Sequence, residues 1–213
     1  MAGYNLICCV VNFGDASKVL KSARKYGVNQ GYISIGRGTA DSRILDFLMI
    51  NEIRKEIVTM VVDGERTADA IKGISGDMAF AKPHHGIGFS YALSEWIGGG
   101  NTGEMTAKTS EVKNSMYKAI YVIVDRGKAE EVVEAANKAG ARGGTIVHAR
   151  GADMQHHKLF SLEIEPEKEK VFIITSAELK DGIVKSIRDQ LKIDEPGNGI
   201  VTVLDIGEAY GLH

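Results

Sequence analysis

The fold is decided by a glycine-rich stretch at residues 140–151, Gly-Ala-Arg-Gly-Gly-Thr-Ile-Val-His-Ala-Arg-Gly. Glycines stand on both sides of a short β-branched run at residues 145–147, which favours a brief extended segment between sharp turns. A weaker copy, Gly-Val-Asn-Gln-Gly-Tyr-Ile-Ser-Ile-Gly-Arg-Gly, occupies residues 27–38. The two copies are 113 residues apart, and this spacing organises the rest of the chain.

The 113-residue spacing extends over most of the chain without a gap. Between residues 4–95 and 117–208, about 25 of the 92 aligned positions are identical. A constant register over that length indicates an internal duplication. The matched pairs include Tyr4 with Tyr117, Gly14 with Gly127, Arg37 with Arg150, Lys55-Glu56 with Lys168-Glu169, and Pro83 with Pro196.

Each half predicts the same order of elements: strand, helix, strand, strand, helix, strand. Apolar β-branched runs predict the strands, and apolar residues at helical spacing predict the helices. In the first half these elements are residues 6–12, 16–26, 32–35, 56–62, 65–74 and 87–92. In the second half they are residues 119–125, 128–139, 145–149, 170–175, 178–191 and 200–205. Thr175 and Glu178 have the spacing of a capping box for the last helix.

This order predicts an α+β protein of two tandem ferredoxin-like (βαββαβ) domains, each with an antiparallel four-stranded sheet. Right-handed crossovers place both helices of a domain on one face of its sheet, so the other face must be covered by another domain. The predicted limits are residues 1–97 for the first domain and 116–213 for the second. Residues 98–115, which are glycine-rich and then polar, are expected to form a linker.

Composition excludes several classes of protein. Of 213 residues, 44% are hydrophobic and 25% charged, and the formal net charge is −2, which argues against nucleic acid as a partner. Cys8 and Cys9 are adjacent in an apolar run and are expected to be reduced core residues. The apolar runs are too short for membrane insertion, and no signal peptide is evident, so we expect a cytoplasmic protein.

With this element order, these glycines and the turn Pro-Gly-Asn-Gly-Ile-Val at residues 196–201, the chain resembles the PII signalling family, the nitrogen regulatory P-II proteins. It looks like a tandem two-domain member, and the resemblance covers residues 4–95 and 117–210. The resemblance implies a cytoplasmic, non-enzymatic, trimeric regulator. Such proteins bind ATP or ADP with 2-oxoglutarate in clefts between adjacent domains. They signal through long T-loops to target proteins, which include enzymes and ammonium transporters.

The resemblance also implies a set of ligand-binding residues. Thr145 corresponds to a strand residue whose hydroxyl faces the nucleotide, and Lys168 or Lys170 lies near the family's lysine at the exit of the T-loop. Glycines supply the backbone contacts to phosphate, at the T-loop entrance and in the phosphate-embracing turn called the B-loop. The entrance glycines are Gly38 and Gly151, and the turn glycines are Gly86, Gly197 and Gly199.

Two features depart from the family pattern. The family's B-loop usually continues with a lysine after its last glycine, whereas Ile87 and Ile200 follow here. The C-terminal segment, residues 206–213, contains no arginine, although the family uses arginines there to hold the triphosphate. Fewer charge-assisted contacts to phosphate are therefore expected. The implied ligand is ATP, ADP, AMP or another small anion.

Several charged residues have two interpretations. Arg37 and Arg150 would each hold an anionic ligand, or would be solvated strand-end residues or members of intersubunit ion pairs. Lys55-Glu56 and Lys168-Glu169 have the same ion-pair interpretation. The pairs His84-His85 and His156-His157 are expected to be exposed loop residues rather than metal ligands. The alternation of charge around Glu163, Glu165, Glu167 and Glu169 is typical of a solvated strand edge.

Alternatives to a ligand-sensing regulator come from other classes of protein. No catalytic motif for acyl transfer, phosphoryl transfer or zinc hydrolysis is evident, which argues against an enzyme. A metal-responsive trimer similar to the CutA family shares the element order, and a scaffold with a decayed ligand site is a third interpretation. Three two-domain chains are the smallest set in which rings of three domains close, so we expect a homotrimer.

Overall fold

The computed structural model describes residues 3–39, 53–93, 115–150, 158–159, 162–163 and 167–212. These residues form two compact units. The first unit takes the described parts of Met1–Ile35, Arg54–Tyr117 and Leu204–His213, and the second those of Gly36–Ile53 and Lys118–Val203. Each unit therefore includes a short segment of the other repeat: residues 204–213 belong to the first unit, and residues 36–53 to the second. The expected linker, residues 98–115, lies outside the described residues except for Ser115, so the domain limits stay predictions.

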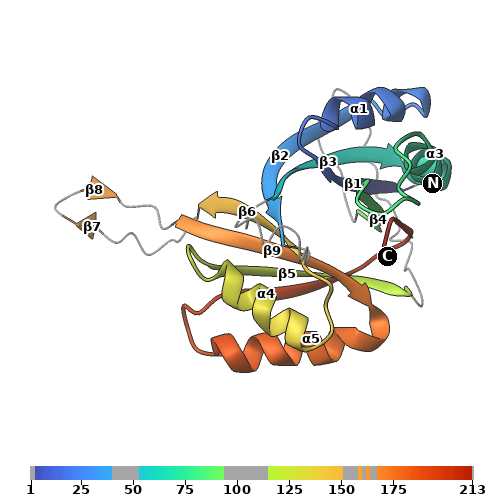
Figure 1. Ribbon diagram of the computed structural model, residues 1–213. Helices are drawn as coiled ribbons and strands as arrows, with labels where there is room; N and C mark the ends of the chain where they lie inside the picture. Colours follow the sequence, from blue (N-terminus) through green and yellow to red (C-terminus); the bar gives the residue numbers. More distant parts are fainter. Residues whose placement is uncertain are drawn as a thin grey trace. The chain divides into compact units, whose positions relative to one another are not determined.

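The first unit has the predicted order of elements. These are β1 (Tyr4–Asn12), α1 (Ala16–Lys25), β2 (Gln30–Gly38), β3 (Ile53–Asp63), the 3-10 helix η1 (Gly64–Arg66), α3 (Thr67–Asp77) and β4 (Ile87–Ala92). Strand β1 pairs antiparallel with both β3 and β4, and the strand order is β2-β3-β1-β4. This is the ferredoxin-like order, and α1 and α3 supply its helices (Figure 1).

The core of the first unit follows from the apolar spacing of its helices. Val19 and Ala23 lie one turn apart on α1, and both are fully buried. On α3, Ala70, Ile71 and Ile74 are likewise fully buried. These side chains pack in one cluster with alternate residues of β1 and β3.

The second unit repeats this architecture. Its elements are β5 (Tyr117–Asp125), α4 (Ala129–Lys138), β6 (Thr145–Arg150), β7 (Lys158–Leu159), β8 (Leu162–Glu163), β9 (Glu167–Ser176), α5 (Ala177–Leu191) and β10 (Ile200–Asp205). The strand order is β10-β5-β9-β6, and α4 and α5 lie together on one face of this sheet (Figure 1). The predicted α+β fold with antiparallel sheets is therefore confirmed.

The structure corrects the details of some predicted elements. The predicted capping box is wrong, because Ser176 is the N-cap of α5 and no side chain caps this helix end. Between β6 and β9, where no strand was predicted, Lys158 pairs with Glu163 and Leu159 with Leu162 in the two short strands β7 and β8. A further short strand, β11 (Ala209–Tyr210), was not predicted.

Strand β11 extends the sheet of the first unit. Ala209 pairs with Phe89 and Tyr210 with Gly88, in antiparallel register with β4. Before this strand, Ser90 donates its backbone N–H to the carbonyl of Glu208 at 2.9 Å and accepts from the N–H of Gly207 at 2.8 Å. The side chain of Tyr210 packs against the core of the unit. A two-residue strand carries no alternation pattern that sequence analysis could detect.

No helix in the described part of the chain is long and apolar enough to cross a lipid bilayer.

Candidate functional site

Matched turns precede β4 and β10, where the sequence suggested phosphate contacts. Gly86 has φ of +121°, and a Cβ there would lie 2.6 Å from the carbonyl oxygen of Val10. Gly199 has φ of +138°, and a Cβ there would lie 2.5 Å from the carbonyl oxygen of Ile123. Both glycines are therefore required by close packing of the turn against the first strand of each repeat, whether or not a ligand binds.

The turns differ at the position two residues before these glycines. Gly197 has φ of +90° in the second repeat, and His84 stands at the equivalent position with φ of 65°. A left-handed conformation costs a residue with a Cβ about 1–2 kcal/mol. The carbonyl of His84 accepts from Nδ2 of Asn12 at 3.1 Å. Asn12 in turn accepts from Nζ of Lys55 at 2.7 Å, and partial burial lowers the pKa of this lysine.

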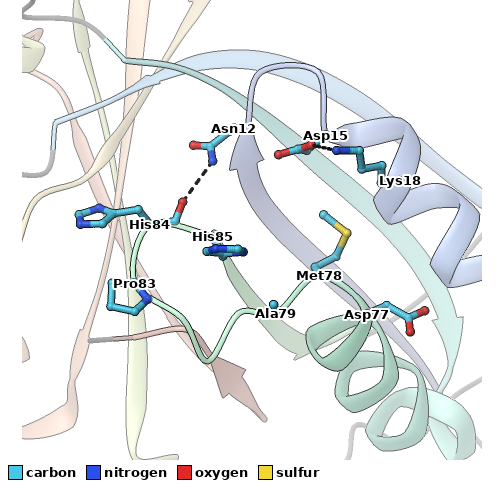
Figure 2. Close-up of a pocket in the computed structure, with 9 residues that line it drawn as sticks. All are labelled: Asn12, Asp15, Lys18, Asp77, Met78, Ala79, Pro83, His84 and His85. Atoms are coloured by element: carbon cyan, nitrogen blue, oxygen red, sulfur yellow. Dashed lines mark hydrogen bonds and ion pairs between the residues drawn. The ribbon is translucent and has the colours of Figure 1, made fainter.

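A cavity of about 440 Å³ in the first unit is bordered by this turn. Figure 2 shows the ring of His85 among the other lining side chains, while the ring of His84 points away from them. Besides the turn, its walls come from the end of β1, the start of α1 and the end of α3. Its lining residues are Asn12, Asp15, Lys18, Asp77, Met78, Ala79, Pro83, His84 and His85.

The charges around this cavity largely neutralise one another. Nζ of Lys18 lies 2.8 Å from Oδ1 of Asp15. Asp77 accepts from Nζ of Lys25 at 2.6 Å and from Oγ of Ser22 at 2.7 Å, and the hydrogen bond from Lys25 is the main cause of its lowered pKa. The lining residues include two carboxylates, of Asp15 and Asp77, and one lysine, Lys18. This balance does not favour a polyphosphate in the cavity.

A carboxylate holds the start of the first helix in each repeat, buried at Glu169 and half-buried at Glu56. Oε2 of Glu169 accepts from the backbone N–H groups of Gly127 and Ala129, both at 3.0 Å. Oε2 of Glu56 accepts from Gly14 at 3.0 Å and from Ala16 at 2.8 Å. A carboxylate at a helix N-terminus accepts hydrogen bonds from backbone N–H groups that have no partner within the helix, and its negative charge interacts favourably with the helix dipole.

These contacts correct two interpretations of the sequence. The side chain of Glu169 is 5% exposed, so the prediction that it belongs to a solvated strand edge is wrong. Glu167, on the same strand, is exposed and pairs with Arg126. The ion-pair interpretation of Lys168-Glu169 is also wrong in its partners. Nζ of Lys168 lies 2.5 Å from Oδ1 of Asp125, in its own repeat.

The second unit brings together predicted residues of both repeats. Gly38 and Thr145 are cross-strand partners of β2 and β6, and Thr145 is 6% exposed. Oγ1 of the adjacent Thr39 accepts from the backbone N–H of Gly144 at 2.8 Å and donates to its carbonyl at 3.1 Å. Arg37 forms an ion pair with Glu130 on the first turn of α4, so its partner lies in the same chain and not in another subunit as one interpretation expected.

The predicted phosphate turn lies elsewhere in this unit. Thr145 begins β6, whereas Gly197 and Gly199 precede β10, and β5 and β9 stand between these two strands. Strands are spaced about 4.8 Å apart, so roughly 14 Å of sheet separates β6 from β10. The two halves of the predicted site therefore do not meet within one unit.

Other predicted residues are described in part or not at all. The backbone of Arg150 pairs with Glu167, but its side chain lies outside the described residues. Gly151 and the pair His156-His157 also lie outside them. Among the described side chains, no group of three or more His, Cys, Asp or Glu is placed to hold a metal ion.

Sequence analysis missed the polar residues that support these turns and helix starts. Asn12 and Asp125 each bind the lysine of the matched Lys-Glu pair, and Glu56 and Glu169 each cap a helix. The conserved register of Lys55-Glu56 and Lys168-Glu169 was a usable signal. The Lys-Glu pair occurs in both repeats because in each one the lysine binds a side chain at the end of the first strand and the glutamate caps the first helix.

Comparison with known proteins assigns the second half of the chain. Residues 117–212 match the family model of nitrogen regulatory protein P-II. The match spans slightly less than half of the chain and coincides with the second repeat. We call this part the P-II-like half.

A solved structure of the GlnK–ATP complex of B. subtilis is similar to part of this chain. The identity is 19%, the alignment covers 45% of this chain and 93% of that one, and the TM-score is 0.36. No curated protein matches the chain.

Proposed function

We propose that this protein is a non-enzymatic regulator of the P-II type, acting in the cytoplasm as a homotrimer. The observation that carries the proposal is the match of the P-II family model to residues 117–212. The βαββαβ order of the same residues supports it, because the two lines of evidence coincide in extent. Target enzymes or transporters are the proposed partners, contacted through the loops that follow β2 and β6.

The proposed ligand is a nucleotide or another small anion bound in the P-II-like half. The turn at Gly197 and Gly199 would offer backbone N–H groups, and Thr145, Arg150 and Gly151 would contribute from β6 and the loop that follows it. Because β5 and β9 stand between β6 and β10, these two groups would have to come from neighbouring copies to meet at one ligand. This requirement is the physical reason for proposing an oligomer.

The described cations limit how many phosphates the site can hold. Lys168 is engaged with Asp125, and Arg37 with Glu130, so each must leave a carboxylate before it binds phosphate. The residues present therefore suit a nucleotide with few phosphates, or a small anion, better than ATP with its full triphosphate. Of the predicted ligand set, the backbone of the Gly197–Gly199 turn needs no such exchange of partners.

Calorimetry on the full-length chain tests the proposal. ATP, ADP, AMP and 2-oxoglutarate are titrated separately. Titrations with Cu²⁺ and Zn²⁺ test the alternative that the protein responds to metal ions. We expect AMP or ADP to bind at least as well as ATP. Arg150→Met should weaken that binding about tenfold or more, because a charge-assisted hydrogen bond is lost.

Arg142→Met is the matched control, since Arg142 is an exposed arginine of the same glycine-rich stretch. It should leave the affinity unchanged. If no nucleotide or anion binds, or if both arginine variants weaken binding equally, the proposed ligand site is wrong. Binding of a metal ion alone would favour the metal-responsive class instead.

A further inference from the structure

Strands β4 and β10 occupy equivalent places in the two repeats but have different surroundings. In the first unit β4 is flanked by β1 and β11, and Phe89 and Ser90 are 0% and 3% exposed. Their counterparts on β10 are Thr202 and Val203, and both are exposed. Among the described residues β10 ends the strand order, with β5 as its neighbour. Within the part of the chain that the structure describes, β11 covers β4, and no strand pairs with the outer side of β10.

Apolar side chains stand on this open edge strand. Ile200 is 58% exposed, and Val203 and Leu204 are each 39% exposed. An edge strand with exposed apolar residues is a template for pairing with another chain. The exposed apolar side chains of β10 therefore indicate that another strand covers this edge and excludes water from it.

The sequence contains a second copy of the covering segment. Residues 207–211, Gly-Glu-Ala-Tyr-Gly, include β11, and the 113-residue repeat aligns them with residues 94–98, Ser-Glu-Trp-Ile-Gly. The glutamates and the last glycines are identical, and an apolar Ile97 corresponds to Tyr210.

The residues just before these segments are held in the same way. The N–H of Ile206 donates to the carbonyl of Tyr117 at 3.2 Å, and the N–H of Leu93 donates to the carbonyl of Tyr4 at 3.0 Å. These four residues are equivalent under the repeat, so both segments start from the same geometry.

A second surface shows the same imbalance. On β2, Tyr32 and Ile33 are 64% and 43% exposed. Their counterparts on β6, Thr145 and Ile146, are 6% and 1% exposed, and they pair with Gly38 and Arg37. Of the last strands, β4 of the first repeat is covered and β10 of the second is exposed. Of the second strands, β6 of the second repeat is covered, whereas Tyr32 and Ile33 on β2 of the first are exposed. A single kind of contact with a further copy of the chain would cover both.

We propose that β10 is an acceptor edge for residues 94–98 of a second copy of this chain, which add to it as an antiparallel strand. The register of β11 on β4 places Trp96 opposite Thr202 and Ile97 opposite Val201. Each copy would donate one segment and accept another on a different surface. The contacts close either as a reciprocal exchange between two copies or as a ring of more copies.

Disulfide trapping between separate chains tests this register. A full-length chain with Trp96→Cys is mixed and refolded with a differently tagged full-length chain carrying Thr202→Cys, then oxidised. Opposed residues of an antiparallel pair have Cα atoms about 4.5–5.5 Å apart, which a disulfide can bridge. We expect a disulfide between the two tagged chains. The native Cys8 and Cys9 are buried at 4% and 0% exposure and should not compete.

Trp96→Cys mixed with Val203→Cys is the matched control, because neighbouring residues of a strand point to opposite faces. It should give little of the mixed disulfide. Equal trapping in the two mixtures, or none in either, overturns the proposal. So does a chain carrying both Trp96→Cys and Thr202→Cys that closes only on itself, since the donor is then not a second copy.

Sedimentation provides an independent measurement. Ile97→Asp should weaken self-association about tenfold or more, because an apolar contact is replaced by a charge. Thr106→Asp introduces the same charge outside the proposed segment and should sediment as the unsubstituted chain does. If Ile97→Asp also leaves the assembly unchanged, residues 94–98 do not cover β10.

Discussion

Removal of the buried charge of Glu169 tests how the P-II-like half is held together. Oε2 of this side chain accepts two backbone N–H groups at the start of α4, from Gly127 and Ala129. A hydrogen bond to a charged group contributes about 1.5–3 kcal/mol, against about 0.5–1.5 kcal/mol for a neutral one. Glu169→Gln keeps an acceptor and loses the charge on both bonds. We therefore expect the free energy of unfolding to fall by about 2–3 kcal/mol.

The first repeat supplies an internal comparison. Glu56 makes the equivalent pair of hydrogen bonds but is half-buried, so solvent screens its charge. Glu56→Gln should cost about half as much as the change at Glu169. Glu167→Gln is the control on the same strand as Glu169, because the side chain of Glu167 is 57% exposed.

Urea unfolding followed by circular dichroism measures these differences, and amide exchange locates them. The N–H groups of Gly127 and Ala129 should exchange faster in Glu169→Gln, while the amides of α1 are unaffected. If Glu169→Gln lies within about 0.5 kcal/mol of the unsubstituted protein, the ordinary range of surface changes, the buried carboxylate does not stabilise the helix.

Three further predictions concern the turn at His84 and its counterpart at Gly197, the C-terminal strand, and Asp77. His84→Gly should stabilise the protein by about 0.5–1 kcal/mol in urea unfolding, because it relieves a left-handed residue, and Gly197→His should have the opposite effect. Deletion of residues 207–213 removes β11 and its hydrogen bonds to β4, so the free energy of unfolding should fall by about 2–4 kcal/mol. An unchanged midpoint would show that the tail does not belong to this unit. Asp77 has a lowered pKa because of its hydrogen bond from Lys25, so its contribution to stability is present above pH 3.8 and is lost as the pH falls through its folded pKa. Acid unfolding of Asp77→Asn should therefore depend less steeply on pH than that of the unsubstituted protein.

The sequence predicted the fold because the signals for it are local and occur twice. Periodicity of apolar residues set the strands and helices, and Gly14, Gly27, Gly127 and Gly140 marked turns that have positive φ in the structure. Comparing two copies at a fixed spacing removed ambiguities that one copy would have left. The boundaries shifted by a few residues, since strand ends depend on the neighbouring strand rather than on the residue itself.

The candidate site was predicted only in part. Gly86 and Gly199 were identified as special positions, and the structure shows that close packing against β1 and β5 is sufficient to require them. Thr145 and Gly38 were both predicted to contact ligand, and they are paired across β6 and β2. That Lys168 would bind Asp125, and Arg37 would bind Glu130, depended on contacts between residues far apart in the sequence.

The sequence alone therefore determined the duplication, the element order and the glycines that the turns require. Only the tertiary structure decided which carboxylates are buried, which cations are already paired, and which strand covers which edge. Glu167 and Glu169 belong to the same alternating pattern of charged residues, yet Glu167 faces solvent and Glu169 caps α4. The covering of β4 by β11 was equally undetectable. Hydrogen-bond partners and burial depend on what the fold brings alongside a residue, and local sequence carries no record of it.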